Sequence, residues 1–505
     1  MPSSLNRRDF LRLAGLLPLG LAAPRWTRRL AAGDRPNILI LVFDALSALH
    51  LPLYGYPRQT MPNLARLAER AIVYHNHYAG SSFTTPGTAS LLTGTLPWTH
   101  RAIRGGGRVA EAAVPHNLFE AFGDMYRLGY SHNSWVEILL RQFASSLEEL
   151  IPRDRLYLGG SRLSPVGLFP ADDDIATVAW TRYIDLDEGH AYSLFASTAG
   201  RLLEQAQRDR YARLFPEGLP GNAARQSFLM EDAVGWFGAR LPQLPQPFLG
   251  YLHFLPPHAP YRPPEGFYGR FAHDGLQFAR KPIDIFHSPV APVDQSRRRE
   301  LYDEFLLYAD RAFGALYDSL EAAGRLENTW LVFTSDHGEM FERGILEHGG
   351  EALYDPIVRV PLLIFEPGRR QRLDIHEPTS AADVLPTLAQ VTGHAAPAWV
   401  EGRVLPPFGP PDAQRPVYAV LARQNDPNRA LTVASTMLVR GSRKLLYYFG
   451  YPVLEGSELV KLYDVESDPE EMNDLSTVEK DAAATLLQEL KGKIAEVNRP
   501  YPGGG

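Results

Sequence analysis

Leu331-Val332-Phe333-Thr334-Ser335-Asp336-His337-Gly338-Glu339 joins an apolar run directly to a group of polar residues. A continuous apolar run is typical of a buried parallel strand, whose carboxyl end carries ligands to the edge of its sheet. A second apolar run, Asn37-Ile38-Leu39-Ile40-Leu41-Val42-Phe43, stops in the same way at Asp44. We therefore expect Asp44, Asp336 and His337 to meet at one edge of a mostly parallel sheet.

A third segment supplies a hydroxyl group. It reads Phe83-Thr84-Thr85-Pro86-Gly87-Thr88-Ala89-Ser90-Leu91-Leu92-Thr93-Gly94. Because proline suits a first helical turn, we expect Thr84 and Thr85 just before a helix whose N–H groups favour a bound oxyanion. Asp-His-Gly alone is often a turn and Thr-Thr-Pro often a helix cap, so the prediction of a site depends on the three segments together.

The combined residue types indicate a metal centre. Asp44, Asp336, His337 and the Thr84 hydroxyl suit zinc or manganese, with calcium or magnesium as further candidates. A divalent ion that touches a threonine hydroxyl lowers the pKa of that hydroxyl and turns it into a nucleophile.

The chain resembles the sulfatase family within the alkaline phosphatase superfamily. The resemblance extends beyond the three segments to Leu53-Tyr54-Gly55-Tyr56, Thr60-Met61-Pro62-Asn63-Leu64, Pro257-His258-Ala259-Pro260-Tyr261, Val360-Pro361-Leu362-Leu363-Ile364 and Lys461-Leu462-Tyr463-Asp464. It implies an α/β fold with a large, mostly parallel sheet flanked by helices and a smaller C-terminal α+β subdomain. It also implies a metal-dependent ester hydrolase.

Three departures from the family pattern refine this resemblance. Sulfatases have Cys/Ser-x-Pro-x-Arg, which matures to formylglycine, whereas this frame reads Thr84-Thr85-Pro86-Gly87-Thr88. Ala45 stands where the family usually has a second aspartate, and no Lys-Trp-His segment follows Gly129-Tyr130. The remaining metal-site residues, Asp44, Thr84, Asp336 and His337, resemble those of the superfamily's threonine-nucleophile branch. This branch includes nucleotide pyrophosphatases and the phosphoethanolamine and phosphoglycerol transferases.

This branch implies cleavage of a phosphoester, a mono- or diester of a small molecule, lipid or glycan, through a covalent Thr84 intermediate. His258 and His348 would contact the transferring group or protonate the leaving oxygen. The alternatives are a sulfatase without formylglycine, a phosphoryl-group transferase and a catalytically silent binding protein. The loose candidates for a second metal are His253, His258, Asp310 and His348, although Asp310, like Asp383, is better explained as a structural partner.

The first residues predict export. Asn6-Arg7-Arg8-Asp9-Phe10 and the short apolar run that follows resemble a twin-arginine signal over residues 1–33, which favours a periplasmic or secreted protein. The run is shorter than the roughly 20 residues of a spanning helix, so no stable membrane span is expected. The chain has no cysteine, which excludes thiol catalysis, and its net charge of -7 gives no sign of a nucleic-acid partner. Oligomeric state is not encoded in a readable motif.

Two domains are predicted after the signal: a catalytic domain over residues 34–403, with an insertion at about 141–241 that we interpret as a substrate lid, and a C-terminal subdomain over residues 404–505. Strands and helices alternate in the first domain, as βαβ units require. Helices are expected at residues 62–71 and 117–128 and a strand at Phe248–Phe254. The C-terminal subdomain should contain short antiparallel strands at 417–421, 437–440 and 444–449, followed by a helix at 478–497.

Overall fold

The computed structural model describes residues 35–158, 202, 206, 209–221 and 227–502. By their mutual contacts, these described residues form one compact unit. The predicted export signal and most of the predicted lid, including Asp172-Asp173-Asp174, lie outside the described residues. The predicted domain boundary near residue 404 stays a prediction. Within the described part of the chain, no helix is long and apolar enough to cross a membrane.

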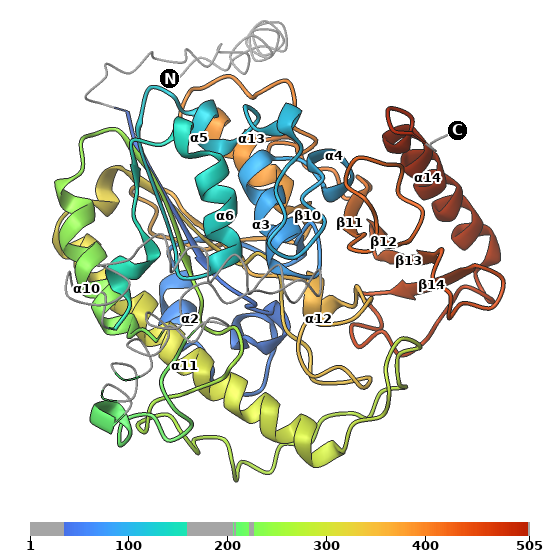
Figure 1. Cartoon of the computed structure of the whole chain (residues 1–505), viewed down its shortest axis with the longest axis horizontal. Helices are drawn as coiled ribbons and strands as arrows, with labels where there is room; N and C mark the ends of the chain where they lie inside the picture. Colours follow the sequence, from blue (N-terminus) through green and yellow to red (C-terminus); the bar gives the residue numbers. More distant parts are fainter. Residues whose placement is uncertain (1–34, 159–201, 203–205, 207–208, 222–226, 503–505) are drawn as a thin grey trace, which may run out of the picture. The chain divides into compact units, whose positions relative to one another are not determined.

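The fold is built on an eight-stranded sheet in the order β5-β4-β6-β1-β7-β8-β2-β9 (Figure 1). Its strands are β1 (Asn37–Phe43), β2 (Ile72–Tyr74), β4 (Tyr126–Ser131), β5 (Glu149–Leu150), β6 (Phe248–Phe254), β7 (Thr329–Thr334), β8 (Leu362–Phe365) and β9 (Leu373–Ile375). Strands β5, β4, β6, β1 and β7 run parallel, while β8 is antiparallel to both of its neighbours. The prediction of a large, mostly parallel sheet is confirmed.

Helices cover both faces of this sheet. Side chains alternate along β1, so that Leu39, Leu41 and Phe43 pack on one side and Ile38 and Val42 on the other. The first face is covered by α2 (Pro62–Ala68), α10 (Met230–Arg240) and α11 (Pro292–Ala322), and the second by α3 (Thr84–Thr93), α5 (Leu118–Ala121), α6 (Ser134–Gln142) and α13 (Val384–Val391). Because both faces are buried, β1 is apolar without alternation.

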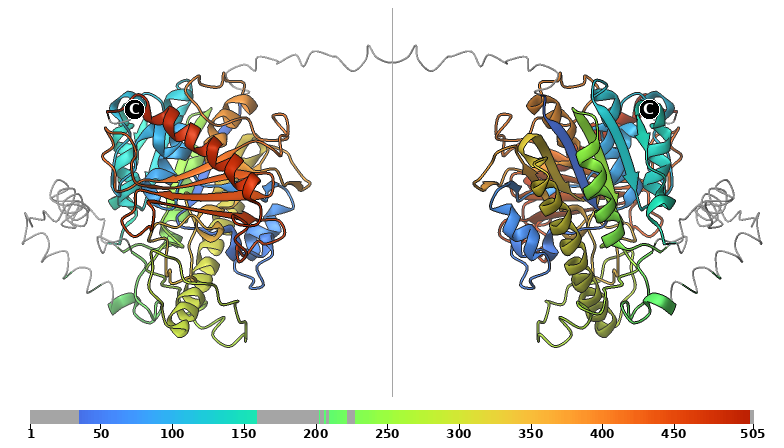
Figure 2. Two further views of the ribbon diagram at one scale, coloured as in Figure 1. Left: turned by 90° about the vertical axis from the view of Figure 1, so that its right-hand side faces the viewer. Right: turned by 90° about the vertical axis from the view of Figure 1, so that its left-hand side faces the viewer.

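The C-terminal part forms a second, four-stranded antiparallel sheet. It consists of β11 (Val417–Leu421), β12 (Ala434–Arg440), β13 (Arg443–Phe449) and β14 (Glu458–Asp464), followed by α14 (Lys480–Asn498). Figure 2 shows α14, in red, lying across one face of these strands. The predicted strands and final helix are confirmed, and β14 is an additional strand.

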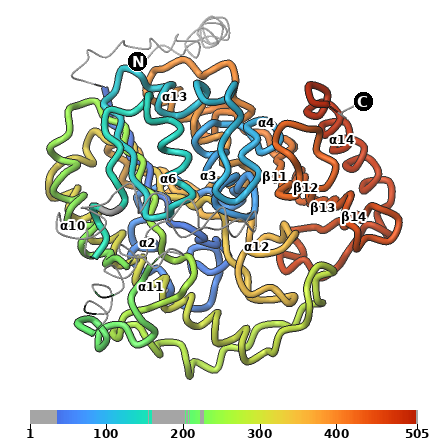
Figure 3. The backbone as a smooth tube through the Cα atoms, in the orientation of Figure 1, coloured from blue at the N-terminus to red at the C-terminus, as the bar shows by residue number. Residues whose placement is uncertain are grey.

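Short elements and one long irregular segment complete the fold. The short elements are α4 (Pro97–His100), α12 (Asp355–Val358) and the paired β3 (His77–Tyr78) and β10 (Thr379–Ser380). Residues 262–291 run toward the C-terminal sheet, as the yellow-green tube in Figure 3 shows. There Phe286 packs on Tyr448, with ring centroids 5.4 Å apart.

Helix α2 ends at Ala68 rather than at residue 71, and two other expected helices differ more from those observed. The pattern at residues 117–128 is a single turn, α5, followed by the start of β4. Gly123 and Asp124 stop the helix in a turn, and the apolar residues beyond them follow the two-residue period of a strand. Helix α3 begins at Thr84 itself, with Phe83 as its N-cap, so Thr84 and Thr85 lie inside the first turn rather than before it.

Candidate active site

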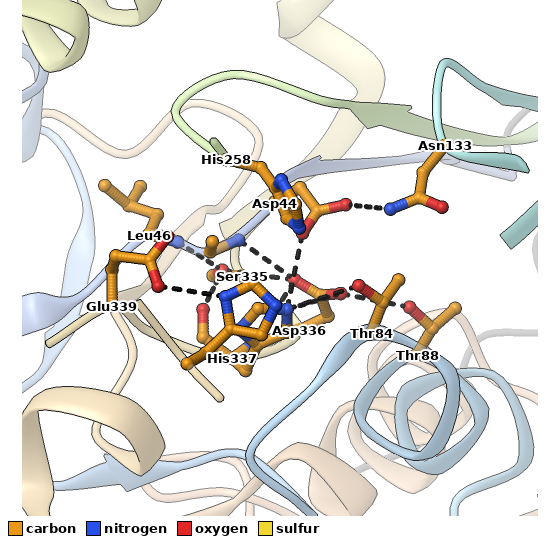
Figure 4. Close-up of polar contacts among 12 residues, drawn as sticks. Asp44, Leu46, Thr84, Thr88, Asn133, His258, Ser335, Asp336, His337 and Glu339 are labelled. Atoms are coloured by element: carbon orange, nitrogen blue, oxygen red, sulfur yellow. Dashed lines mark hydrogen bonds and ion pairs between the residues drawn. The ribbon is translucent and has the colours of Figure 1, made fainter. Parts of the chain in front are cut away.

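Two carboxylates meet at the carboxyl ends of neighbouring parallel strands. Asp44 follows β1, and Asp336 and His337 follow β7, which pairs directly with β1. All three side chains are fully buried, and their ligand atoms lie within 4.8 Å of one another. Figure 4 shows Asp44 beside Asn133, with Asp336 and His337 below Asp44. Within the described part of the chain this is the one cluster of such groups with metal-site spacing.

The two oxygens of Asp44 have different surroundings. Its Oδ2 accepts hydrogen bonds from Asn133 Nδ2 at 2.6 Å and from His253 Nε2 at 3.1 Å. Its Oδ1 is buried and accepts no hydrogen bond from the described residues. A buried carboxylate oxygen without a hydrogen bond is costly, so Oδ1, which has His337 Nε2 as an ion-pair partner at 3.4 Å, indicates where a cation would bind.

The imidazole of His337 presents one nitrogen to this cluster. Its Nδ1 lies 2.9 Å from the carbonyl oxygen of Gly338, to which it donates. Its Nε2 lies 3.4 Å from Asp44 Oδ1, 3.7 Å from Asp336 Oδ2 and 3.3 Å from Thr84 Oγ1. A histidine whose Nδ1–H is held by a backbone carbonyl offers the Nε2 lone pair to a metal.

The negative charges of Asp44 and Asp336 also favour a positive charge in this cluster. Burial and the negative charge of Asp44 raise the pKa of Asp336. Burial alone would raise the pKa of Asp44, but His258, His253 and His337 together hold that pKa well below its usual range. Burial alone would lower the pKa of His337, but Asp336 and Asp44 outweigh it and raise that pKa to about 9. In the metal-free protein a proton on His337 therefore balances part of the carboxylate charge.

Helix α3 brings Thr84 to the carboxylates through a close backbone contact. A Cβ added to Gly87 would lie 2.2 Å from the carbonyl oxygen of Asp336, so only glycine permits this approach. Thr84 Oγ1 then lies beside His337, while Thr88 Oγ1, one turn later, donates to Asp336 Oδ2 at 3.4 Å.

Ala45 is held in the left-handed region, with a φ of 59°. A non-glycine residue in this region costs on the order of 1 kcal/mol. The Tyr302 hydroxyl donates to the Ala45 carbonyl at 2.7 Å, and the Ala45 N–H lies 3.3 Å from Asp336 Oδ1. The turn after β1 therefore contributes a main-chain donor to the site.

A cleft of about 680 Å³ opens next to Thr84. Its lining residues include Asn133, Trp135, Tyr261, His258 and His348. The sequence therefore identified both cleft histidines, whose rings lie 4.8 Å apart.

The cleft histidines are held in different ways. His258 Nδ1 lies 2.7 Å from the Ala259 carbonyl oxygen, and His348 Nδ1 lies 2.9 Å from Glu339 Oε1. Burial, together with the charges of His337 and His258, lowers the pKa of His348 well below its ordinary value. Burial raises the pKa of Glu339 to about 8. Because both Nδ1 atoms are occupied, Nε2 is the atom that each ring has left for a substrate.

Two other candidate acids have structural roles. Asp310 on α11 accepts hydrogen bonds from the backbone N–H groups of Asn63 and Leu64, at 2.9 and 2.8 Å, and so caps α2. Asp383 forms a capping box with Ser380 and a bidentate ion pair with Arg415. Asp310 is therefore not part of a second metal site in this structure.

The sequence patterns assign no role to Asn133 or Glu339 and place His253 only among the loose candidates for a second metal. Asn133 follows the end of β4, and the rule that polar residues gather at strand ends would have found it. The helical interpretation of residues 117–128 hid that strand. His253 is the next-to-last residue of β6, where its side chain reaches Asp44.

The donor set fits a divalent cation. It combines two carboxylates, one of them with an oxygen that accepts no hydrogen bond from the described residues, an imidazole in the ligating tautomer and an adjacent hydroxyl, all on neighbouring elements. Such mixed oxygen and nitrogen donors are those that zinc and manganese accept.

Comparisons with known proteins show the family to which this chain belongs. A family model described as Sulfatase matches residues 36–143 and 188–394. Choline-sulfatase of Rhizobium meliloti (strain 1021) is 24% identical over 474 residues, covering 88% of this chain and 82% of the relative. Arylsulfatase A of Homo sapiens is 25% identical over 509 residues, covering 92% of this chain and 87% of the relative.

The fold of a solved structure is also similar. The phosphonate monoester hydrolase of Agrobacterium radiobacter has a TM-score of 0.62 at 20% identity, covering 91% of this chain and 96% of its own.

We predict that metal removal destabilises the protein and that Asp336→Asn abolishes this effect. Zinc at a hundredfold excess over its Kd should stabilise the wild-type protein by about 2.7 kcal/mol. Asp336→Asn removes one buried charge, so it should melt at or above the chelator-treated wild type and show no zinc-dependent shift. Thermal melting with chelator and with zinc measures both effects.

The control for this prediction is Asp318→Asn, whose side chain is 61% exposed on α11. It should keep the full zinc-dependent shift. A shift of equal size in Asp336→Asn and wild type would contradict a metal centre at Asp336.

Proposed function

The chain belongs to the sulfatase family of ester hydrolases. We propose that it cleaves phosphoesters, mono- or diesters, through a covalent intermediate on Thr84. The observation that carries the proposal is the position of the Thr84 hydroxyl, 3.3 Å from His337 Nε2 and at the wall of the cleft. Thr88 also lies near Asp336 but does not line the cleft.

Asp44, Asp336, His337 and Thr84 would hold the divalent ion. When bound, the ion lowers the pKa of an adjacent hydroxyl and offsets negative charge on the transferring group. The protein holds these ligands in place before substrate arrives, because Gly87 fixes α3 against Asp336 and Gly338 fixes the orientation of His337.

Thr84 acts as the nucleophile in the first of two displacement steps and as the leaving group in the second. Its hydroxyl proton is lost to solvent through the cleft, and Oγ1 attacks phosphorus. The Oγ1–P bond forms as the bond from phosphorus to the leaving oxygen breaks, and the departing alcohol takes up a proton. Water then attacks phosphorus, the Oγ1–P bond breaks, and Thr84 recovers its hydroxyl. The first-turn N–H groups of α3 would stabilise charge on the transferring oxygens.

His258 and His348 are the candidate groups for contacting the transferring group and protonating the leaving alcohol, and the lowered pKa of His348 favours His258 for the proton transfer. Both line the cleft and both have Nδ1 occupied by a neighbour. His348 is held by Glu339, which in turn accepts a hydrogen bond from Tyr261 at 2.9 Å. These two hydrogen bonds fix the plane of the His348 ring and leave its Nε2 atom for the substrate.

Sulfate ester cleavage is the second candidate function. It is supported by the choline-sulfatase and arylsulfatase A relatives, since both are named for sulfate esters. Thr84 would then attack sulfur directly, because threonine does not mature to formylglycine.

We predict that Thr84→Ala lowers turnover of the best nitrophenyl ester on the order of 10³-fold or more, since the nucleophile is lost. The panel contains phosphate monoester, phosphodiester, phosphonate monoester and sulfate, each with and without chelator. Acid quenching followed by mass spectrometry should find the transferred group on Thr84. Selective turnover of the sulfate would favour the second candidate.

Thr85→Val is the matched control, because the Thr85 hydroxyl is also buried in α3 but accepts from Gly106 N rather than facing the ligands. It should retain most of the activity. Full activity in Thr84→Ala would rule out the covalent mechanism for either ester.

We predict that loss of the histidine that protonates the leaving alcohol lowers turnover more for esters with a poor leaving group than for esters with a good one. A general acid contributes about 10²- to 10⁴-fold. The variant that loses it, His348→Gln or His258→Gln, should therefore be impaired about 10²-fold on a phenyl ester but much less on the nitrophenyl ester. The two variants serve as controls for each other. If both respond equally to the two leaving groups, neither histidine is the acid.

We further propose that residues 1–33 direct export to the periplasm or beyond, which rests on Arg7 and Arg8 ahead of a short apolar run. Replacing both arginines with lysine in the full chain should leave the protein in the cytoplasm of a bacterial host. Cell fractionation checks this, and an unchanged periplasmic fraction would contradict the proposal.

A further inference from the structure

Asn133 connects the metal centre to the helix that forms one wall of the cleft. It follows β4 and is the N-cap of α6, with its Oδ1 accepting from Trp135 N at 2.8 Å. Its Nδ2 donates to Asp44 Oδ2 at 2.6 Å. The side chain is buried, so both ends of its amide are committed inside the protein.

The backbone of Asn133 is held as firmly as its side chain. Its N–H donates to Ser131 Oγ at 2.8 Å, and its carbonyl accepts from Glu137 N at 3.0 Å. A short amide donor on a fixed backbone can therefore restrain the rotation of the Asp44 carboxylate.

We infer that Asn133 is a positioning residue that aims Asp44 at the metal. Together with His253 it occupies Oδ2, which leaves Oδ1 as the free ligand atom opposite His337. Partners behind a metal ligand hold its orientation and typically change metal affinity by about 10- to 100-fold when they are removed. The inference rests on the proposed metal centre but not on the identity of the ester.

The same amide gives the centre a link to the substrate cleft. Trp135 lies in the first turn of α6 and lines the cleft next to Thr84. Because Asn133 caps that turn with one end and holds Asp44 with the other, one side chain connects the cleft wall to the metal ligand.

The test compares zinc affinity in Asn133→Ser and Asn117→Ser. Serine is as good an N-cap as asparagine, so Asn133→Ser keeps the cap on α6 and removes only the donor to Asp44. Asn117 is the matched control because it is also a buried N-cap asparagine, on α5, whose Nδ2 donates to the Val114 carbonyl and not to the site. Metal-free proteins are titrated with zinc against a chromophoric chelator, and melting in chelator reports stability.

Asn133→Ser should bind zinc 10- to 100-fold more weakly than wild type, while Asn117→Ser stays within about twofold. Both variants should melt at similar temperatures in chelator. Equal zinc affinity in wild type and Asn133→Ser would overturn the positioning role alone, whereas no zinc binding by wild type would overturn the metal centre. Asn133→Thr, which also keeps a cap, replaces Asn133→Ser if the latter does not fold, with the same expectation.

Discussion

Two carboxylates buried side by side are the constraint on which the rest of this site depends. Asp44 and Asp336 are fully buried, and a pair of like charges removed from water is unfavourable unless a positive group lies between them. The neighbouring strands β1 and β7 leave no freedom to separate these side chains. The surrounding histidines, the amide of Asn133 and the glycine contact with α3 can all be understood as fixing this pair for a cation.

The C-terminal sheet stabilises the backbone next to this carboxylate pair. Lys444 on β13 is fully buried between Asp355, at 2.6 Å, and Glu471, at 2.8 Å. Asp355 begins α12, and the carbonyl of Ile357 in that helix accepts from Gly338 N at 2.6 Å. Removing one member of such a buried ion pair usually costs several kcal/mol. The second sheet therefore restrains the backbone immediately after the ligands.

The sequence could predict the features that depend on local pattern. The apolar runs of β1, β6 and β7 identified the central strands, and their polar ends identified Asp44, Asp336 and His337. The sequence-based prediction was wrong at residues 117–128, where the helical and the strand period both fitted the apolar residues. Because this error hid β4, it also hid Asn133, which follows that strand. Glu339 could be read as part of the His337 segment, but its contact with His348 depends on a loop that folds back on itself. No local pattern specifies such a contact.

The central position of β1 has a consequence for how the protein folds. Asn37 on β1 contacts Phe248, 211 residues away, and Thr329, 292 residues away. Closing such long loops slows folding, and β1 must wait for partner strands that emerge much later in synthesis. Until β6 emerges, β1 is an apolar segment without either of its partner strands, and until β7 emerges one edge of β1 stays unpaired. Truncated chains that end before residue 329 should therefore aggregate and cannot assemble the ligand set.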